Sequence, residues 1–338
     1  MRQIKASFLM VCAGVFVALL IGVARADDQP ATQPMAIIGG PAATQPVMPA
    51  LFMRFVDDGH GGGALQTAHV AFKDSQGREV DLIAAVHIGE KAYYTQLNQD
   101  FQKYDAVLYE LIKPRDAAPP TLGSGSTSDN PISKFQTFLK TALDLDFQLD
   151  DVDYTAPNFV HADLDKETFE RLQEERGETF TDLMLKQLVK AMTNPPPQAA
   201  GDEPTMKDVV HLMTAPDGER QIKVVIAKQL GDMDTAAMGL DGPGGSVIVT
   251  ERNKAAMQTL DDTLGKGAKK VAIFYGAAHM PDMASRLEAE GFKPVATGWT
   301  VAWDLTIRAD QPSAIESLLD NLLNANDADN SGPKDNGN

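Results

Sequence analysis

The sequence predicts an α/β fold: a mostly parallel central sheet flanked by helices, with antiparallel strands near its beginning and a helical cap inserted in its middle. Three segments are almost continuously apolar, which is typical of strands buried on both faces of a sheet. These segments are 80–86, 106–112 and 271–275. Between the first two, residues 91–103 place Tyr94, Leu97 and Phe101 on one face of a helix. A strand, helix and strand at this spacing predict a right-handed parallel crossover.

Residues 1–26 predict a signal peptide, because a basic start and an apolar run over 6–23 lead to the small-residue pattern Ala24-Arg25-Ala26. Cleavage there gives an exported chain, periplasmic or secreted. The alternative is an uncleaved helix that anchors the chain to a membrane, since the run is close to the minimum length of a membrane span. Cys12 lies in this run and follows Val11, a context that disfavours lipoprotein processing.

Composition excludes several kinds of site and partner. Cys12 is the only cysteine, so the mature chain has no disulfide and no thiol nucleophile, and any metal ion must be held by His, Asp or Glu. The net charge of −17 becomes about −20 without the three basic residues of the signal peptide, which excludes nucleic acid as an expected partner. This charge would attract metal cations or cationic peptides, although a need for solubility also explains it.

Two terminal segments are predicted to lie outside the folded domain. Residues 27–50 are rich in Ala, Pro, Gln and Thr and predict a disordered tether. Residues 324–338 are mostly Asn, Asp, Ser and Gly and predict a disordered tail. The domain between them, 51–323, is long enough to bury a substantial core without covalent cross-links.

The domain begins with two predicted antiparallel strands, 51–56 and 68–72, which lead into the first buried strand. An insertion, about 113–245, follows the second buried strand and contains loop-like stretches dense in Pro, Gly and Ser. Within it, residues 132–145 and 166–192 have the apolar spacing of helices. We therefore expect the insertion to form a mainly helical cap.

Two predicted helices flank the last buried strand. Residues 247–264 place Met257 and Leu264 on one stripe, and residues 281–290 form a second helix that ends at Gly291. Helices on either side of buried strands complete the pattern of an α/β fold.

Three ionisable side chains, His87, Glu110 and His279, lie at the ends of the three buried strands. In open α/β sheets, ligands bind beyond the carboxyl ends of the strands. Glu110 lies within the apolar segment 106–112, and an ionised carboxylate in a buried strand is costly unless a metal ion, a cation or hydrogen bonds compensate it. A buried ion pair with Arg252 or Lys113 is the alternative to a functional role. Each histidine alone is better explained as a capping residue, but the coincidence of all three favours a site.

Two imidazoles and one carboxylate form a ligand set for a catalytic divalent ion with an open coordination position. Such an ion lowers the pKa of bound water from about 15.7 toward about 7, which makes hydroxide available at neutral pH. Zn, Mn and Co all suit these ligands, so the identity of the metal is left open. The chemistry predicted for the site is hydrolysis.

Both histidines end a four-residue motif: Ala84-Ala85-Val86-His87 and Gly276-Ala277-Ala278-His279. With Glu110 in the segment 104–110, these motifs resemble the TraB family, which includes PrgY pheromone-shutdown proteins, GumN-like proteins and TIKI Wnt-cleaving proteases. The family is related in fold to erythromycin esterases and ChaN. The second motif matches the family's Gly-x-x-His pattern, whereas Ala84 stands where a glycine is expected. The resemblance covers about 78–115 and 246–304.

The resemblance implies a metal-dependent hydrolytic site in which His87 and His279 hold the ion, and Glu110 either completes the ligand set or acts as general base. It also implies roles for Arg252 and Asn253, which resemble an Arg-Asn pair on the helix before the last strand. Arg252 would bind a substrate carboxylate or a developing oxyanion. A charge on the helix surface is the alternative for Arg252.

The other histidines are interpreted as structural. His161 precedes the predicted cap helix at 166–192, where a capping role is favoured over an approach to the site. His60 lies in a glycine-rich turn with no helix after it, which disfavours phosphate binding. His69 and His211 have no motif around them.

Three functions stay open on the sequence alone. The leading hypothesis is a peptidase-like, metal-dependent hydrolase that acts on a peptide or small-molecule amide or ester outside the cytoplasm. The second is a metal-free esterase in which His87 is a general base oriented by Glu110, and activity that survives exhaustive chelation would favour it. The third is a non-catalytic envelope protein that binds a peptide, haem or a metal ion. The oligomeric state is not predicted.

Overall fold

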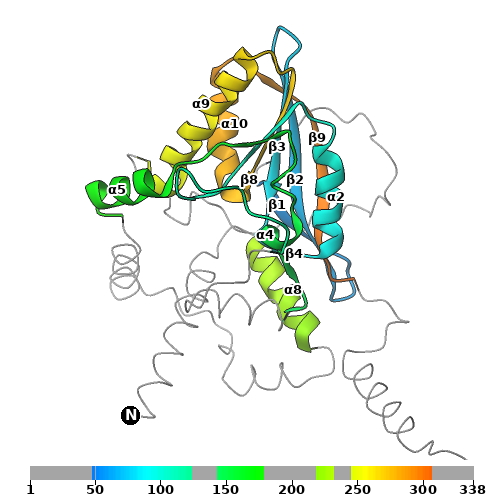
Figure 1. Ribbon diagram of the computed structural model, residues 1–338. Coiled ribbons are helices and arrows are strands. Elements are labelled where there is room, and N and C mark those ends of the chain that lie inside the picture. Colours follow the sequence, from blue (N-terminus) through cyan, green and yellow to red (C-terminus); the bar gives the residue numbers. More distant parts are fainter. Residues whose placement is uncertain (1–47, 50, 124–142, 179–217, 232–244, 307–338) are drawn as a thin grey trace, which may run out of the picture.

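The computed structural model describes residues 48–49, 51–123, 143–178, 218–231 and 245–306. Within these residues, a seven-stranded mixed sheet has helices on both faces, which confirms the predicted α/β fold (Figure 1). The strand order is β1-β2-β3-β8-β5-β7, and β9 pairs with β2.

The parallel part of the sheet carries the three predicted buried strands. These are β3 (Glu79–Ala85), β8 (Lys270–Gly276) and β5 (Ala106–Tyr109). They are joined by β7 (Phe159–His161), which comes from the insertion and pairs with β5, so the insertion contributes a strand as well as helices. All four strands run in the same direction, and their carboxyl ends therefore meet at one edge.

The strand predicted over 106–112 ends earlier, at Tyr109, so Glu110 is the first residue beyond it. In the register of the sheet, Ala85 lies beside Gly276 and Tyr109 lies beside Phe274. Strand pairing thus brings the residues that directly follow these strands close together.

The antiparallel part consists of β1 (Met53–Asp57), β2 (Gly63–Lys73) and β9 (Lys293–Asp304). Strand β2 is longer than the predicted 68–72. It pairs with β1 over its first half, with β3 over its second half and with β9 along most of its length. Strand β9 was not predicted, because its residues alternate weakly between buried and exposed positions before Ala302.

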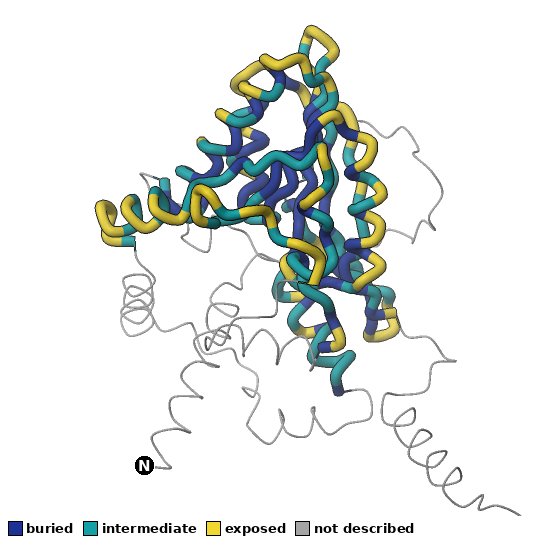
Figure 2. Tube along the Cα trace, viewed as in Figure 1, coloured by how far each residue is buried: buried dark blue, intermediate teal, exposed yellow. Residues whose placement is uncertain are grey.

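Helices cover both faces of the sheet (Figure 1). On one face, α9 (Arg252–Gly265) and α10 (Met280–Ala289) pack on one core cluster, and on the other α2 (Lys91–Phe101) packs on a second. The side chains of β3 alternate between them, with Leu82 in the first cluster and Ile83 in the second, so the strand interior is buried throughout (Figure 2). Helix α9 is preceded by a turn of π-helix, η1 (Val247–Glu251), which confirms the predicted helical segment.

The described parts of the insertion include short elements close to the carboxyl edge of the sheet. Strand β6 (Asp146–Phe147) pairs with β4 (Ile88–Gly89), and α4 (Gln148–Asp151) follows directly. Two further helices are α5 (Lys166–Arg176) and α8 (Gly218–Gly231). Helix α5 starts at the Asp165 side chain, which accepts a hydrogen bond from the Thr168 N–H, and ends at Gly177 in the left-handed conformation.

Several predicted segments lie outside the described residues. They are the signal peptide, most of the tether, residues 124–142, residues 179–217 and the tail. Among the helices of the described part, none is long and apolar enough to cross a membrane.

Candidate functional site

The structure brings His87, Glu110 and His279 together at the carboxyl edge of the sheet. A Cβ atom built on Gly276 would lie 3.3 Å from Glu110 Oε2, 3.7 Å from His87 Nε2 and 3.8 Å from His279 Cδ2. The three side chains thus surround one small space, which is open because residue 276 has no side chain. Strand pairing places two of them, and the 3₁₀ turn η2 (Ala277–His279) after β8 places the third.

Glu110 is held by a cation on one side and a backbone amide on the other. Its Oε1 accepts a hydrogen bond from Arg252 Nη2 at 2.7 Å, and its Oε2 accepts one from the Gly276 N–H at 2.7 Å. Burial alone would raise the pKa of Glu110, but the Arg252 guanidinium and the two nearby imidazoles lower it to about 2. Glu110 is therefore a buried anion at neutral pH, and the predicted ion pair with Arg252 is present.

Arg252 lies between two carboxylates. Besides Glu110, its Nε and Nη2 donate to Asp163 at 2.9 and 2.5 Å, and the Asp163 side chain is fully buried. Burial would lower the pKa of Arg252, but the hydrogen bond to Asp163 and the charge of Glu110 outweigh it and raise the pKa. Arg252 is only 7% exposed, so the alternative of a surface helix charge is wrong. In this arrangement Arg252 fixes Glu110, and binding of substrate by its guanidinium stays a prediction.

His279 is buried, and Asn253 hydrogen-bonds to both its carbonyl and its ring. The Asn253 Nδ2 donates to His279 O at 3.1 Å and to Asp282 Oδ2 at 2.7 Å, so the amide oxygen must face the ring. His279 Nδ1 lies 2.6 Å from that oxygen and therefore carries the proton, which leaves a lone pair on Nε2. Nε2 lies 3.6 Å from Glu110 Oε1 and 3.5 Å from Arg252 Nη1.

The charge state of His279 follows from its surroundings. Burial lowers its pKa, and although the Glu110 carboxylate raises it, Arg252 lowers it further, to about 4. The ring is therefore neutral at neutral pH, which is the state required of a metal ligand.

His87 is exposed, unlike His279. Its Nδ1 lies 3.1 Å from Gln148 Oε1, and its carbonyl accepts a hydrogen bond from the Gln148 N–H at 3.0 Å. The loop after it is tied to β9, because Trp303 Nε1 donates to Ile88 O at 2.8 Å. Ala84, which stands where the resemblance expects glycine, is fully buried in the core cluster with α9 and α10, so its methyl group is accommodated.

The remaining histidines have structural contacts or none near the site. His161 Nε2 donates to Leu111 O at 2.7 Å, and His69 Nε2 lies 3.0 Å from Asp81 Oδ2. His60 is exposed in its turn, and His211 lies outside the described residues. Lys113, the other predicted partner of Glu110, instead donates to Ala117 O.

Two residues of the site, Asp163 and Gln148, were not predicted. Both belong to the insertion, and neither lies in a motif or at a periodic position. The only sequence signal was that a buried cation such as Arg252 needs a second carboxylate once Glu110 is shared.

The side chains around Gly276 are of the types that bind a divalent ion, although their ligand atoms do not yet converge on one point. The set offers two imidazole Nε2 atoms and a carboxylate, and each oxygen of Glu110 keeps a lone pair beyond its single hydrogen bond. Within the described residues, no three His, Cys, Asp or Glu side chains are gathered tightly enough to hold a metal ion as they stand. Closure would require the side chains to move toward one point, and the exposed His87 has room to do so.

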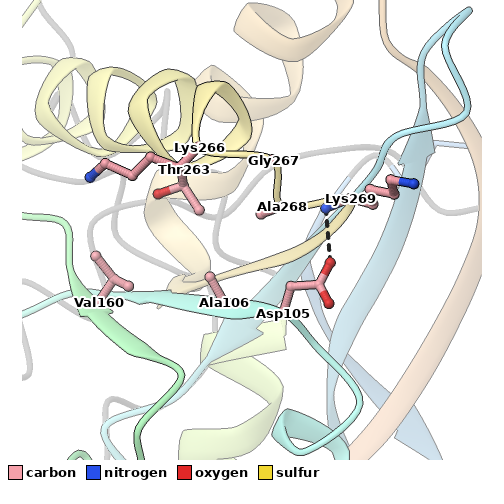
Figure 3. A pocket seen from close by; sticks show the side chains of 8 residues that line it. All are labelled: Asp105, Ala106, Val160, Thr263, Lys266, Gly267, Ala268 and Lys269. Atoms are coloured by element: carbon pink, nitrogen blue, oxygen red, sulfur yellow. Dashed lines mark hydrogen bonds between the residues drawn. The ribbon is translucent and has the colours of Figure 1, made fainter.

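A surface pocket of about 510 Å³ lies elsewhere, at the amino ends of β5 and β8 (Figure 3). Asp105, Ala106, Lys266 and Lys269 are among its lining residues, and Asp105 accepts the Lys269 N–H at 2.8 Å. None of the residues that line it belongs to the candidate site.

Comparison with known proteins identified no matching family model, no matching curated protein and no matching solved structure. The site must therefore be interpreted from its own geometry.

Proposed function

We propose that the chain is a metal-dependent hydrolase of the TraB type that acts on a peptide or a similar amide or ester outside the cytoplasm. The observation that carries the proposal is the convergence of His87 Nε2, Glu110 Oε2 and His279 on the space beside Gly276. His87, His279 and Glu110 would hold the ion. When bound, a divalent ion would polarise a substrate carbonyl and make hydroxide available at neutral pH.

The tautomers of the two rings support this assignment. Each Nδ1 faces a side-chain amide oxygen, of Gln148 for His87 and of Asn253 for His279. A hydrogen bond from the remote ring nitrogen to an oxygen is the usual way in which proteins orient a metal-binding imidazole. His87 Nε2 is thereby available beside Glu110. His279 Nε2 lies 3.6 Å from Glu110 Oε1 and accepts from Arg252 Nη1 at 3.5 Å, a contact that a bound ion would replace.

The charge on Glu110 favours one of its two predicted roles. A carboxylate whose pKa is about 2 is a weak base, because the best general bases have a pKa near the working pH. Its two hydrogen bonds also fix its position against Gly276. We therefore assign Glu110 to the ligand set and not to proton transfer.

A second candidate, the metal-free esterase, is favoured by the exposure of His87 and by its fixed Nδ1 contact. In that mechanism His87 Nε2 would remove a proton from water or from the substrate hydroxyl. The orienting residue would be Gln148 and not the predicted Glu110, since the hydrogen bonds of Glu110 go to Arg252 and Gly276.

Metal analysis separates these candidates. The wild-type protein, loaded with Zn²⁺, Mn²⁺ or Co²⁺ and then freed of excess ion, should retain about one ion per chain. His87→Ala, Glu110→Ala and His279→Ala should lose it. His60→Ala, which removes an exposed histidine away from the site, is the matched control and should bind as the wild type does.

Hydrolysis of a peptide library and of simple esters should then depend on the ion. Exhaustive chelation should abolish turnover, and return of the ion should restore it. Folded His87 and His279 variants that keep the ion would overturn the metal proposal, and turnover that survives chelation would favour the esterase.

A further inference from the structure

Gln148 stands out because it contacts His87 twice and lies outside the segments that resemble a known family. It is the first residue of α4 and is 4% exposed. Its backbone N–H donates to His87 O at 3.0 Å, and its Oε1 lies 3.1 Å from His87 Nδ1. One residue of the insertion therefore holds both the backbone and the ring of an exposed histidine.

The other end of the Gln148 amide is fixed by a buried tyrosine. Gln148 Nε2 donates to Tyr154 OH at 2.8 Å, and Tyr154 is 2% exposed, with its ring 5.0 Å from that of Tyr109. Burial raises the pKa of the Tyr154 hydroxyl, so it stays protonated. In the orientation that the structure gives the amide, Nε2 faces Tyr154 and Oε1 faces the imidazole.

An amide oxygen accepts hydrogen bonds and cannot donate them. With Oε1 facing it, His87 Nδ1 carries the proton, and the lone pair lies on Nε2, the atom that faces Gly276. Free imidazole in water does not hold one tautomer in this way. The contact with Gln148 thus fixes which nitrogen of the exposed ring carries the lone pair and where that lone pair points.

The same solution occurs at the other histidine of the site. Asn253 places its amide oxygen 2.6 Å from His279 Nδ1 and donates to the carbonyl of the same residue. Gln148 reproduces both contacts at His87, although it uses its backbone N–H for the carbonyl. Two unrelated segments thus prepare the two rings in one way.

We propose that Gln148 is a positioning residue that holds His87 as the Nδ1–H tautomer with its Nε2 lone pair directed at the space beside Gly276. Its consequence for metal binding rests on the proposed function, whereas the tautomer itself does not. The insertion accordingly completes the site.

The tautomer can be read in the full-length, metal-free protein by ¹⁵N–¹H correlation spectra of labelled histidine rings, with His87 assigned by comparison with His87→Ala. The wild type should show a protonated Nδ1 and an unprotonated Nε2 at a pH where the ring is neutral. Gln148→Leu should lose this signature. Gln148→Glu keeps an acceptor oxygen and should preserve it, and Gln96→Leu, at an exposed position of α2, is the matched control.

A wild-type ring protonated on Nε2, or a Gln148→Leu ring unchanged from the wild type, would overturn the proposal whether or not the protein is a hydrolase. In the metal arm, Gln148→Leu should weaken Co²⁺ binding by about 10- to 100-fold, and Gln96→Leu should not. A correct tautomer without Co²⁺ binding by the wild type would reject the proposed function alone.

Discussion

The two histidines of the site make the same kinds of hydrogen bonds, but one is buried and the other is exposed. His279 is 4% exposed and lies within a buried set of charges, whereas His87 is exposed at the end of β3. Both have an amide oxygen at Nδ1 and an N–H at their carbonyl. The two rings differ in their solvent exposure and in the charged groups around them.

The buried half is an electrostatic unit. Arg252 forms ion pairs with both Glu110 and Asp163. Asn253, the next residue of the same helix, contacts the His279 ring. Each of these groups has lost its water, so each depends on its partners for charge compensation. On the exposed half, the backbone of His87 is held by Gln148, but its exposed ring meets Gln148 through a single side-chain contact, so the ring can move at little cost.

This contrast suggests a division of labour in the proposed enzyme. The buried half is pre-formed and carries the charge, and the exposed half is positioned from the insertion and is free to close on an ion or a substrate. Rigid ligands with one adjustable partner are compatible with binding and release.

The largest predicted effect comes from removing the cation that unites the buried half. Arg252→Met leaves the carboxylates of Glu110 and Asp163 buried without their shared cation and should lower the free energy of unfolding by about 3–5 kcal/mol. Urea denaturation of the metal-free protein measures it. Arg171→Met removes an exposed i,i+4 pair on α5 and should cost less than about 0.5 kcal/mol.

The comparison predicts a smaller loss on the exposed half. Gln148→Leu should cost about 1 kcal/mol, because water can replace the amide at His87 Nδ1 while Tyr154 loses a partner. An equal loss for Arg252→Met and Gln148→Leu would show that the two halves are not energetically distinct.

The same contrast explains what could be predicted from the sequence. The three strand ends were predicted, because continuous apolar runs mark buried parallel strands and parallel pairing brings their ends together. Glu110 was singled out by the cost of an ionised group inside a predicted buried strand, and its pairing with Arg252 was foreseen as an alternative.

The partners of His87 could not be predicted. Gln148 and Trp303 reach its loop across 61 and 215 residues of sequence, measured from His87 and Ile88, and nothing periodic marks either one. Strand β9 was missed because its residues before Ala302 are exposed or only partly buried, so the sequence shows no clear alternation. Asp163 follows a short edge strand, β7, which carries too few residues for a pattern.

The buried half can also be tested by pH. The folded-state pKa of His279, about 4, lies below the ordinary value of 6.5, so the unfolded chain binds this proton more readily than the native protein does. Stability from this group is complete above pH about 6.5 and is lost as pH falls to about 4, by roughly 3 kcal/mol. Urea titrations with chelator present, at intervals across this range, measure the loss.

His279→Asn keeps a donor toward Asn253 Oδ1 but cannot titrate, so its stability should be nearly flat between pH 6.5 and 4 relative to the wild type. His60→Ala removes an exposed histidine and should leave the wild-type slope intact. A His279→Asn protein with the full wild-type slope would locate the titrating group elsewhere. The Glu110 contribution would remain in both, because its window lies lower, from about 4.5 down to about 2.

The smallest effect on stability is expected where the two halves meet. Gly276 has φ near −52°, which alanine adopts readily, so Gly276→Ala should change the free energy of unfolding by less than about 1 kcal/mol. The new methyl group would nevertheless lie 3.3 Å from Glu110 Oε2 and 3.7 Å from His87 Nε2, in the space that the ion would share. Co²⁺ binding should therefore weaken by at least about tenfold, which corresponds to about 1.4 kcal/mol.

Gly298→Ala on β9 is the matched control, because a Cβ there meets no atom within 4 Å. Isothermal titration of both variants with Co²⁺ separates a steric effect at the site from a general effect of replacing glycine. If Gly276→Ala bound Co²⁺ as tightly as Gly298→Ala did, the ion would have to lie outside the space between the two halves. His279 and His87 would then not bind the same ion, and their similar tautomers would need another explanation.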